Sequence, residues 1–233
     1  MTAAVAAIDW PRVEAELDTA GAAVLGPLLD IETCRRLASS YDDDSAFRSH
    51  VIMARHGFGQ GEYKYFDHPL PVPLPGLREA LYGRLAPIAN RWNEALGVAA
   101  RFPSDHAAFL ERCHAAGQRR PTPLLLRYRV GDHNCLHQDV YGEHVFPLQV
   151  VILLSSPGDE FTGGELVLTE QRPRMQSRAE VLTPTQGEGV VFPVRHRPVH
   201  GRKGVYRVNV RHGVSRLRWG ERFTTGLIFH DAA

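Results

Sequence analysis

Apolar positions in the first half of the chain recur every three or four residues, the period of one helix face. The longest such stripe runs through 77–96, where Pro87 is expected to kink or divide the helix. Pro11 suits the first turn of an earlier helix, and Asp30 suits the N-cap of another. The pattern therefore predicts helices that begin near residues 11, 31, 77 and 107.

The pattern changes after Pro121, where short apolar or alternating runs are separated by glycine and proline. Regular short strands of this kind predict an antiparallel sandwich or barrel. We expect an α+β chain that forms one domain over 1–233, with a mainly helical section at 1–120 and a β core at 121–233. The predicted core strands lie at 124–130, 146–154, 165–168, 189–192, 205–210 and 226–230.

A glycine-rich stretch, 51–66, precedes the long helical stripe. Its glycines are surrounded by cationic and aromatic side chains, among them Tyr63, Lys64 and Tyr65. Such a segment can act as a substrate lid that stacks on a planar ligand. The alternative is a surface hairpin whose aromatic side chains pack on the core.

Composition adds little for the whole chain, since its net charge is +1, but the charge is unevenly distributed. Between 170 and 222 there are twelve Lys and Arg residues against four acids, which indicates an anionic ligand or, equally, an arginine-rich composition. Three widely spaced cysteines give no disulfide framework. The N-terminus resembles no signal peptide and no run is long enough to span a membrane, so we expect a cytoplasmic protein with no membrane partner. Nothing in the pattern predicts an oligomeric state.

The chain contains one His-x-Asp, His137-Gln138-Asp139, on a strand that follows a turn at 131–134. Residues two apart on a strand point to the same face, so the imidazole and the carboxylate can bind one metal. Two histidines and one carboxylate are the ligands of non-haem Fe(II) oxygenases. A lone motif of this kind also occurs by chance on surface turns. A second histidine is available downstream as His196 or His200.

An arginine-rich strand follows, on which Arg207, Asn209 and Arg211 alternate and so share one face. If that face is buried, the three polar side chains require a partner, and a dicarboxylate would supply one. The alternative is an exposed strand face.

These residues resemble a known superfamily. The run RYRVGDHNCLHQD resembles AlkB-type dioxygenases, in which a Tyr precedes the metal-binding His by nine residues, as Tyr128 precedes His137 (137 − 128 = 9). Arg207-Val208-Asn209 resembles the AlkB Arg-x-Asn, although the further Arg of AlkB proteins is replaced here by Gly213. The segment 159–166 resembles the Phe-x-Gly-Gly-Glu-Leu hairpin of prolyl-hydroxylase-like members. Most of the chain resembles a bacterial family of 2-oxoglutarate/Fe(II) oxygenases predicted to modify nucleic acids.

The resemblance implies a double-stranded β-helix, or jelly roll, that holds Fe(II) by His137, Asp139 and a distal histidine. Family spacing places that histidine about ten residues before a cosubstrate arginine, which favours His196 (207 − 196 = 11) over the alternative His200. The resemblance further implies 2-oxoglutarate and O2 as cosubstrates, with succinate and CO2 as co-products. The cosubstrate would be held by Arg207, Tyr128, Asn209 and Arg211.

Three functions remain open. The first is a dioxygenase that demethylates or hydroxylates a modified base in single-stranded or locally opened DNA or RNA. The second is a hydroxylase of a protein side chain or a small metabolite, and the third is a jelly-roll binding module without activity. For the first, the expected substrate contacts are Tyr141, Glu143, His144, Tyr63, Lys64, Tyr65, Arg172 and Arg174.

Overall fold

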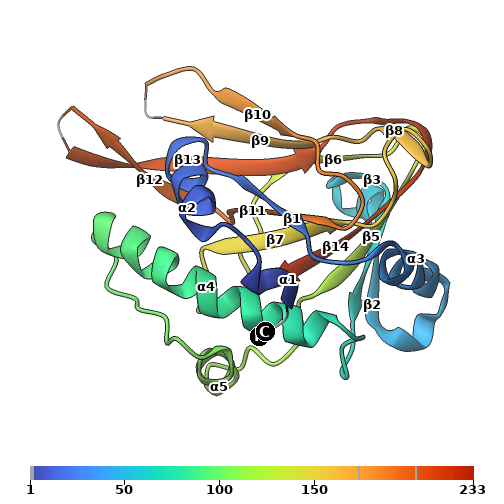
Figure 1. The fold of residues 1–233 in the computed structure, drawn as a ribbon, viewed down its shortest axis with the longest axis horizontal. Helices are drawn as coiled ribbons and strands as arrows, with labels where there is room; N and C mark the ends of the chain where they lie inside the picture. The colour runs from blue at the N-terminus through green and yellow to red at the C-terminus, as the bar shows by residue number, and fades with distance from the viewer. Residues whose placement is uncertain (1–2, 173, 203) are drawn as a thin grey trace.

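A computed structural model describes residues 3–172, 174–202 and 204–233 and contains two antiparallel sheets that face each other (Figure 1). The strand order of the larger sheet is β1-β11-β7-β14-β5-β4-β2, and β8 pairs with β14. The order of the smaller sheet is β10-β9-β13-β6-β3, and β12 pairs with β13. Two facing antiparallel sheets form the expected jelly-roll core.

The larger sheet contains β1 (Ala23–Pro27), β2 (Phe47–Ile52), β4 (Glu62–Phe66), β5 (Leu124–Arg129), β7 (Leu148–Leu153), β8 (Phe161–Gly163), β11 (Glu188–Pro193) and β14 (Leu217–Ile228). The smaller sheet contains β3 (Gly59–Gln60), β6 (His133–His137), β9 (Leu166–Gln171), β10 (Arg178–Leu182), β12 (His196–Gly201) and β13 (Gly204–Val214). The helices are α1 (Ala3–Ala6), α2 (Trp10–Thr19), α3 (Ile31–Ser39), α4 (Leu74–Ala95) and α5 (His106–Ala115). Short 3-10 turns are η1 (Ser40–Asp42), η2 (Asp44–Ala46) and η3 (Met53–His56).

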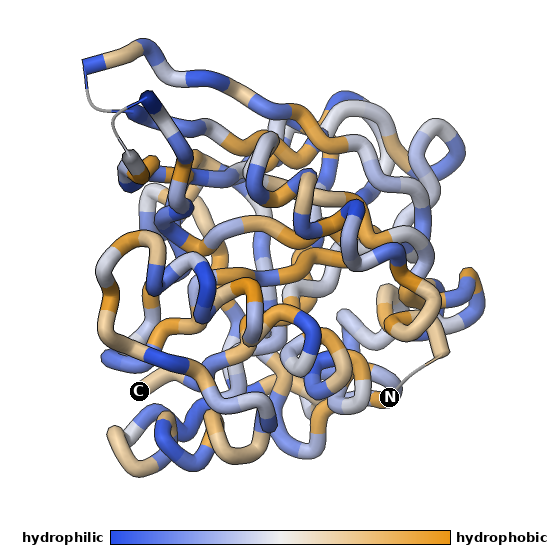
Figure 2. The backbone as a smooth tube through the Cα atoms, turned by 60° about the vertical axis from the view of Figure 1, so that its left-hand side comes forward, coloured by the Kyte–Doolittle hydropathy of each residue, from blue (hydrophilic) through white to orange (hydrophobic). Residues whose placement is uncertain are grey.

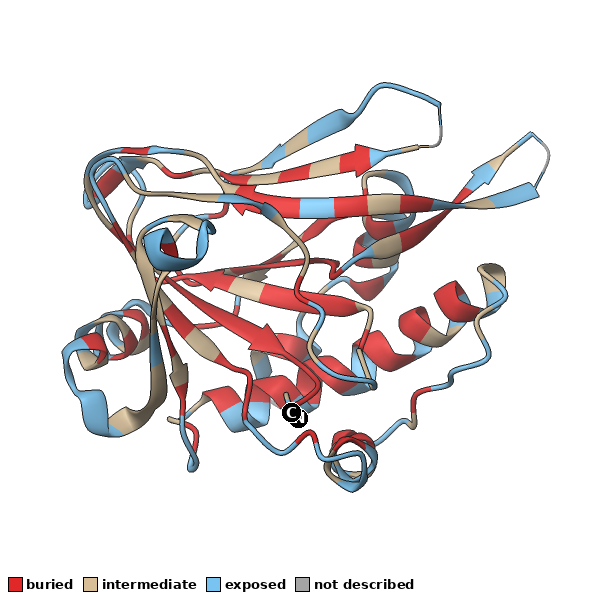
Figure 3. Cartoon of the chain, turned by 180° about the vertical axis from the view of Figure 1, so that it is seen from behind, coloured by how far each residue is buried: buried red, intermediate tan, exposed pale blue. Residues whose placement is uncertain are grey.

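Helices α4 and α5 cover the outer face of the larger sheet (Figure 1). The predicted apolar stripe of α4 is buried, including Leu81, Leu85 and Trp92, while its other side is exposed (Figure 3). Each such side chain contributes about 1.5–3 kcal/mol by leaving water. Pro87 lies inside α4 and does not divide it. The helices therefore brace the larger sheet, and apolar residues concentrate in the central strands (Figure 2).

The predicted helix starts at Pro11 and Asp30 are confirmed, and the Asp30 carboxylate accepts from the Thr33 amide at 2.7 Å. The expectation of a mainly helical section over 1–120 is incomplete, because β2, β3 and β4 extend both sheets. No helix in the described part of the chain is both long and apolar enough to cross a membrane.

The segment 51–66 is not a loose lid, because it pairs with both sheets. On β3, Gly59 lies opposite Asn134 of β6, and on β4, Tyr63 lies opposite Leu126 of β5. Gly59 has a φ of +125°, and a Cβ there would lie 2.4 Å from the His133 carbonyl oxygen. Its glycines thus permit close strand approach rather than movement.

Candidate metal and cosubstrate site

His137, Asp139 and His212 meet between the two sheets. Their ligand atoms all lie within 4.8 Å of one another. The Asp139 carboxylate is 3.5 Å from His137 Nε2 and 3.1 Å from His212 Nε2. His137 ends β6, His212 lies opposite it on β13, and Asp139 follows two residues after His137. Two imidazoles and one carboxylate are a donor set that suits Fe(II).

The hydrogen bonds of His137 orient it as a metal ligand. Its Nδ1 lies 2.7 Å from the Cys135 carbonyl oxygen, which can only accept. The proton therefore sits on Nδ1, and the lone pair of Nε2 points toward Asp139. His212 has no partner for its buried Nδ1 within the described residues.

The charges of the three groups also suit a cation. Burial acts to raise the pKa of Asp139, but His212 and His137 outweigh it and hold that pKa well below its usual range. Burial lowers the pKa of His212, although Asp139 opposes this effect. The site therefore presents an ionised carboxylate beside a neutral imidazole, as metal binding requires.

The expectation that His196, or alternatively His200, is the third ligand is wrong. His196 lies on β12 opposite Asn209, and His200 lies opposite Val205 near the far end of the same hairpin. Asn209 is on the face of β13 opposite to His212, because successive residues of a strand alternate. The structure brings His212 to the metal ligands instead.

The three ligands share a cavity of about 240 Å³ with a buried arginine, Arg222. Arg222 is 3% exposed, and its Nε and Nη1 have no hydrogen-bond partner within the described residues. Burial lowers the pKa of Arg222 to about 10, against Tyr128 and Glu165, so the guanidinium stays charged at neutral pH. An unpaired buried cation is costly, and a carboxylate in the cavity would accept charge-assisted hydrogen bonds from this guanidinium.

The hairpin that contains Gly163 and Gly164 leaves room for the Arg222 side chain. Gly164 has a φ of +66°, and a Cβ there would lie 2.9 Å from Arg222 Cδ. The Arg222 guanidinium lies 5.8 Å from the ring centre of Phe161 and 5.6 Å from that of Tyr128. The segment that resembled a prolyl-hydroxylase hairpin thus packs directly against the buried arginine.

Tyr128 lines the same cavity and is fully buried. Its hydroxyl accepts a long hydrogen bond of 3.4 Å from Asn134, and burial raises its pKa to about 12. The phenol therefore remains protonated and can donate to a ligand. Its placement fits the predicted role at the cosubstrate, which stays a prediction.

Arg207, Asn209 and Arg211 do not enter the cavity. Val208, Val210 and His212 occupy the buried side of β13, so the odd-numbered residues face outward, where Arg207 and Arg211 are exposed. Asn209 accepts a 2.8 Å hydrogen bond from Gln138. The expected role of this row at the cosubstrate is corrected, and the exposed-face alternative holds.

The predicted substrate residues divide into two groups. Tyr63 and Tyr141 line the cavity, and Tyr65 packs edge-on against Tyr141 with 6.5 Å between ring centres. The Tyr141 hydroxyl donates to Asp139 Oδ1 at 2.8 Å, so this side chain reaches a metal ligand directly. These aromatic side chains flank the metal side of the cavity.

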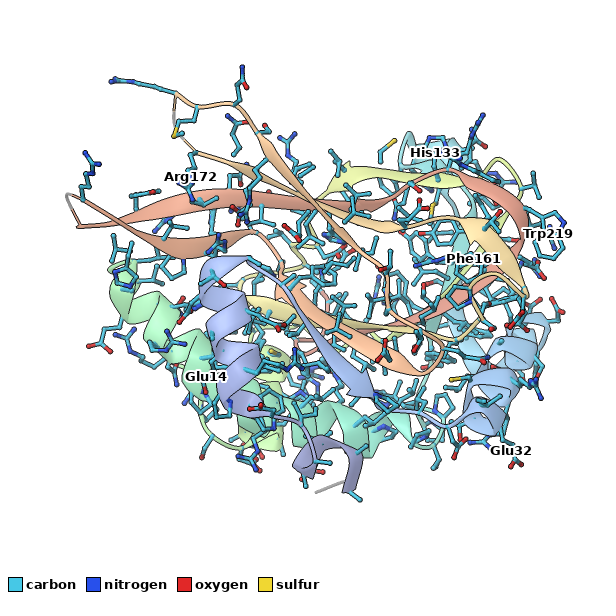
Figure 4. All side chains as sticks on the ribbon, turned by 45° about the horizontal axis from the view of Figure 1, so that its top comes forward. Glu14, Glu32, His133, Phe161, Arg172 and Trp219 are labelled. Atoms are coloured by element: carbon cyan, nitrogen blue, oxygen red, sulfur yellow. The ribbon has the colours of Figure 1, made fainter. Side chains whose placement is uncertain are left out.

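The other predicted contacts lie outside the cavity. The Lys64 ammonium donates to the Tyr41 carbonyl and pairs with Asp44 at 2.6 Å, which points it away from the site and corrects that expectation. Glu143 is exposed on the loop after Asp139, and the adjacent His144 is held through its backbone by Gln118. Arg172 and Arg174 lie on the hairpin between β9 and β10 (Figure 4).

A signal in the sequence could have identified His212 and Arg222. The two residues are ten apart (222 − 212 = 10), which is the family spacing applied earlier to His196 and Arg207. Side chains also alternate between the two faces of β13, so His212, next to the exposed Arg211, points to the opposite, buried face. The similarity of Arg207-Val208-Asn209 to a short motif outweighed both observations.

Comparisons with known proteins place this geometry in a family. Residues 61–232 match the model of the family Oxygenase-NA, described as an oxygenase catalysing oxidative methylation of damaged DNA. Two uncharacterised proteins of Mycobacterium tuberculosis are each 52% identical over 168 residues, which is 72% of this chain and 72% of theirs.

Solved structures share the fold. A prolyl-4-hydroxylase of Pseudomonas putida has a TM-score of 0.55 and 18% identity, over 96% of this chain and 99% of that one. An oxidoreductase of the 2OG-Fe(II) oxygenase family from Burkholderia pseudomallei has a TM-score of 0.51 and 17% identity, over 96% and 93%. These likenesses confirm the expected jelly roll. The family match shows that the chain belongs to the Oxygenase-NA family, and the jelly-roll fold and the His-Asp-His cluster agree with that assignment.

Proposed function

We propose that the protein oxidises a modified base in nucleic acid, demethylating or hydroxylating it, with 2-oxoglutarate and O2 as cosubstrates and succinate and CO2 as co-products. The observation that supports 2-oxoglutarate as cosubstrate is the buried guanidinium of Arg222 in the cavity of the His-Asp-His cluster. Its Nε and Nη1 have no hydrogen-bond partner among the described residues. The family description supports the nucleic-acid substrate.

The residues fit both groups that the proposal requires. His137, Asp139 and His212 would hold Fe(II), since they offer two imidazole nitrogens and one carboxylate oxygen. Arg222 would bind the far carboxylate of 2-oxoglutarate, and the Tyr128 hydroxyl would donate to the same ligand. When bound, the iron and its cosubstrate supply the oxidising chemistry.

The chain supplies placement and exclusion of water. The Tyr141 hydroxyl holds Asp139 in orientation, and the Cys135 carbonyl fixes the tautomer of His137. Leu126, Val151 and Leu166 give the cavity apolar walls, which would limit the access of water to a bound metal. These contacts hold Asp139 and His137 in the orientation that metal binding requires.

The aromatic residues beside the metal ligands suit a planar substrate. Tyr63, Tyr65 and Tyr141 present rings on which an unstacked base can pack. An enzyme that acts on a base must take it from a single strand or flip it from a duplex. The substrate would therefore be single-stranded or locally opened DNA or RNA.

The test is a turnover screen with purified protein, Fe(II) and 2-oxoglutarate. Methylated single-stranded oligonucleotides should increase succinate formation and lose the modification, as mass spectrometry would show. Unmodified oligonucleotides of the same sequence are the control. Stimulation by peptides or metabolites alone would favour the hydroxylase alternative, and absence of any 2-oxoglutarate turnover would leave a binding module.

The hairpin arginines provide a second test. Arg172→Glu with Arg174→Glu should weaken oligonucleotide binding and leave turnover of 2-oxoglutarate without substrate unchanged. The Arg172 guanidinium packs 5.5 Å from the ring centre of Tyr206, outside the cavity. Binding should fall as salt rises, because phosphate contacts release counterions.

A further inference from the structure

The outward face of the smaller sheet is bare and basic. Figure 1 shows the helices on the larger sheet and between the layers, and none drawn over the outward face of β13, β9 and β10. On β13, Arg207 and Arg211 are exposed, whereas the intervening Val208 and Val210 are buried. This face is therefore open to solvent at Arg207 and Arg211.

The strand register extends this row across the sheet. Asn209 lies opposite His196 of β12 on one side and opposite Gln171 of β9 on the other, and Arg211 lies opposite Thr169. Directly opposed residues point to the same face of a sheet. The arginines are thus flanked by side chains that can hydrogen-bond a phosphate or a sugar.

The positive charge of this row is not neutralised locally. Within the described residues, no Asp or Glu lies within salt-bridge distance of Arg207 or Arg211. The acidic residue of β9, Glu170, points to the buried side, where it pairs with Arg197 and, at 3.3 Å, with Arg178. The outward face therefore carries uncompensated positive charge and suits a polyanion.

Gln138 joins this face to the cavity. It stands between the two ligands His137 and Asp139, lines the cavity, and donates through Nε2 to Asn209 Oδ1 at 2.8 Å. The same nitrogen lies 2.7 Å from the Val210 carbonyl oxygen. A strand lying on the outward face would consequently pass beside the mouth of the metal site.

We propose that this surface, formed by Arg207, Asn209, Arg211 and Gln171 and called the basic face, docks the phosphodiester backbone of the substrate strand. The inference rests on the proposed function and names where the nucleic acid lies. Arg207 and Arg211 are about 13 Å apart at a rise of ~3.3 Å per residue. Contacts to phosphate and sugar position a strand without reading its sequence.

The test compares two charge reversals by fluorescence anisotropy with a methylated single-stranded oligonucleotide. Arg207→Glu with Arg211→Glu should weaken binding at least ten-fold at low salt. Loss of two phosphate contacts should reduce the slope of log K against log salt by about 1.4, at ~0.7 per contact for single strands. Turnover of 2-oxoglutarate without oligonucleotide should stay at the wild-type rate.

The matched control is Arg216→Glu with Arg218→Glu, which changes the net charge equally. These exposed arginines lie beside Trp219, on the side of the molecule opposite Arg172 (Figure 4). This control should bind the oligonucleotide within about two-fold of the wild type. Arg207→Lys with Arg211→Lys, which keeps the charge, should retain most binding.

The outcomes separate the two proposals. If the wild type oxidises the oligonucleotide but the Arg207 and Arg211 reversal binds like the control, the basic face is overturned and the proposed function stands. Equal losses in both reversal variants, or failure of the lysine variant to bind, would also overturn it. If the wild type neither binds nor oxidises any oligonucleotide, both proposals fail.

Discussion

Two arginines of this protein are almost equally buried, yet their surroundings differ. Arg78 is 3% exposed and donates to the Ile228 carbonyl, the His230 carbonyl and the Asp231 carboxylate, the last at 2.8 Å. Arg222 is also 3% exposed, but its Nε and Nη1 have no partner in the described chain. The protein itself supplies hydrogen-bond acceptors to the Arg78 guanidinium, whereas Nε and Nη1 of Arg222 have no acceptor among the described residues. Buried charge therefore indicates a binding site only where its hydrogen bonds are incomplete.

The largest expected effect concerns the three metal ligands, which share the cavity of Arg222. His212→Ala should abolish Fe(II) binding, because two ligands do not hold the ion. His196→Ala is the matched control and should bind Fe(II) as the wild type does. Anaerobic titration measures both. If His196→Ala alone loses the metal, the cluster around His212 is not the iron site.

Replacing Arg78, whose hydrogen bonds the protein itself supplies, should lower the free energy of unfolding. Arg78→Met leaves the Asp231 carboxylate buried beside His114 alone, and loss of one partner of a buried pair costs about 3–5 kcal/mol. Urea unfolding measures the loss. The double variant Arg78→Met with Asp231→Leu should recover much of it. A stability unchanged in the single variant would contradict the structural role given to Arg78.

Breaking the incomplete arginine should affect the cosubstrate instead. Arg222→Leu removes charge-assisted hydrogen bonds worth about 1.5–3 kcal/mol each, so KM for 2-oxoglutarate should rise about 100-fold. The free energy of unfolding of the apoprotein should not fall, since an uncompensated buried charge is removed. A large loss of stability with an unchanged KM would show that Arg222, like Arg78, has a structural role and does not bind the cosubstrate.

A smaller effect is expected at Tyr141. Tyr141→Phe removes the hydrogen bond to Asp139 and should weaken Fe(II) affinity about ten-fold, as for other groups that orient a metal ligand. Tyr65→Phe alters the neighbouring ring without touching Asp139 and is the control. Equal affinities in the two variants would show that the Tyr141 hydroxyl does not position the ligand.

The last prediction is a pH dependence of the unfolding free energy that comes from His106, near Arg78. Burial, with Arg78 nearby, lowers the pKa of His106 to about 4, against about 6.5 in an unfolded chain. The unfolded state binds the proton more readily, so stability is complete above pH 6.5 and falls as the pH drops toward 4. The slope is at most about 1.4 kcal/mol per pH unit. His106→Gln should flatten the curve of unfolding free energy against pH, and an identical slope would exclude His106.

The sequence predicted what short-range periodicity controls. The stripe of α4, the N-cap at Asp30 and the strands that carry His137 and Arg207 depend on neighbours in the chain, and all formed where expected. The predicted pair His137 and Asp139 also came together, although β6 ends at His137 and Asp139 follows two residues later.

Long-range register decided the rest. Strand β4 joined the larger sheet through β5, and no local pattern in 51–66 distinguishes that pairing from a loop. His212 was missed because Arg207 and Asn209 of the same strand matched a motif, although His212 points to the other side of that strand. Only the pairing of β13 with β6 and β9 establishes which side is buried.

The short connection between β13 and β14 has a consequence for how this chain can vary. His212 and Arg222 lie on consecutive strands in different sheets, and only residues 215–216 join those strands. An insertion of one residue between the two would turn one of them to the opposite face. Natural variants should therefore keep this interval fixed in length, while the outer ends of the β9–β10 and β12–β13 hairpins, which extend beyond the body in Figure 1, can gain or lose residues.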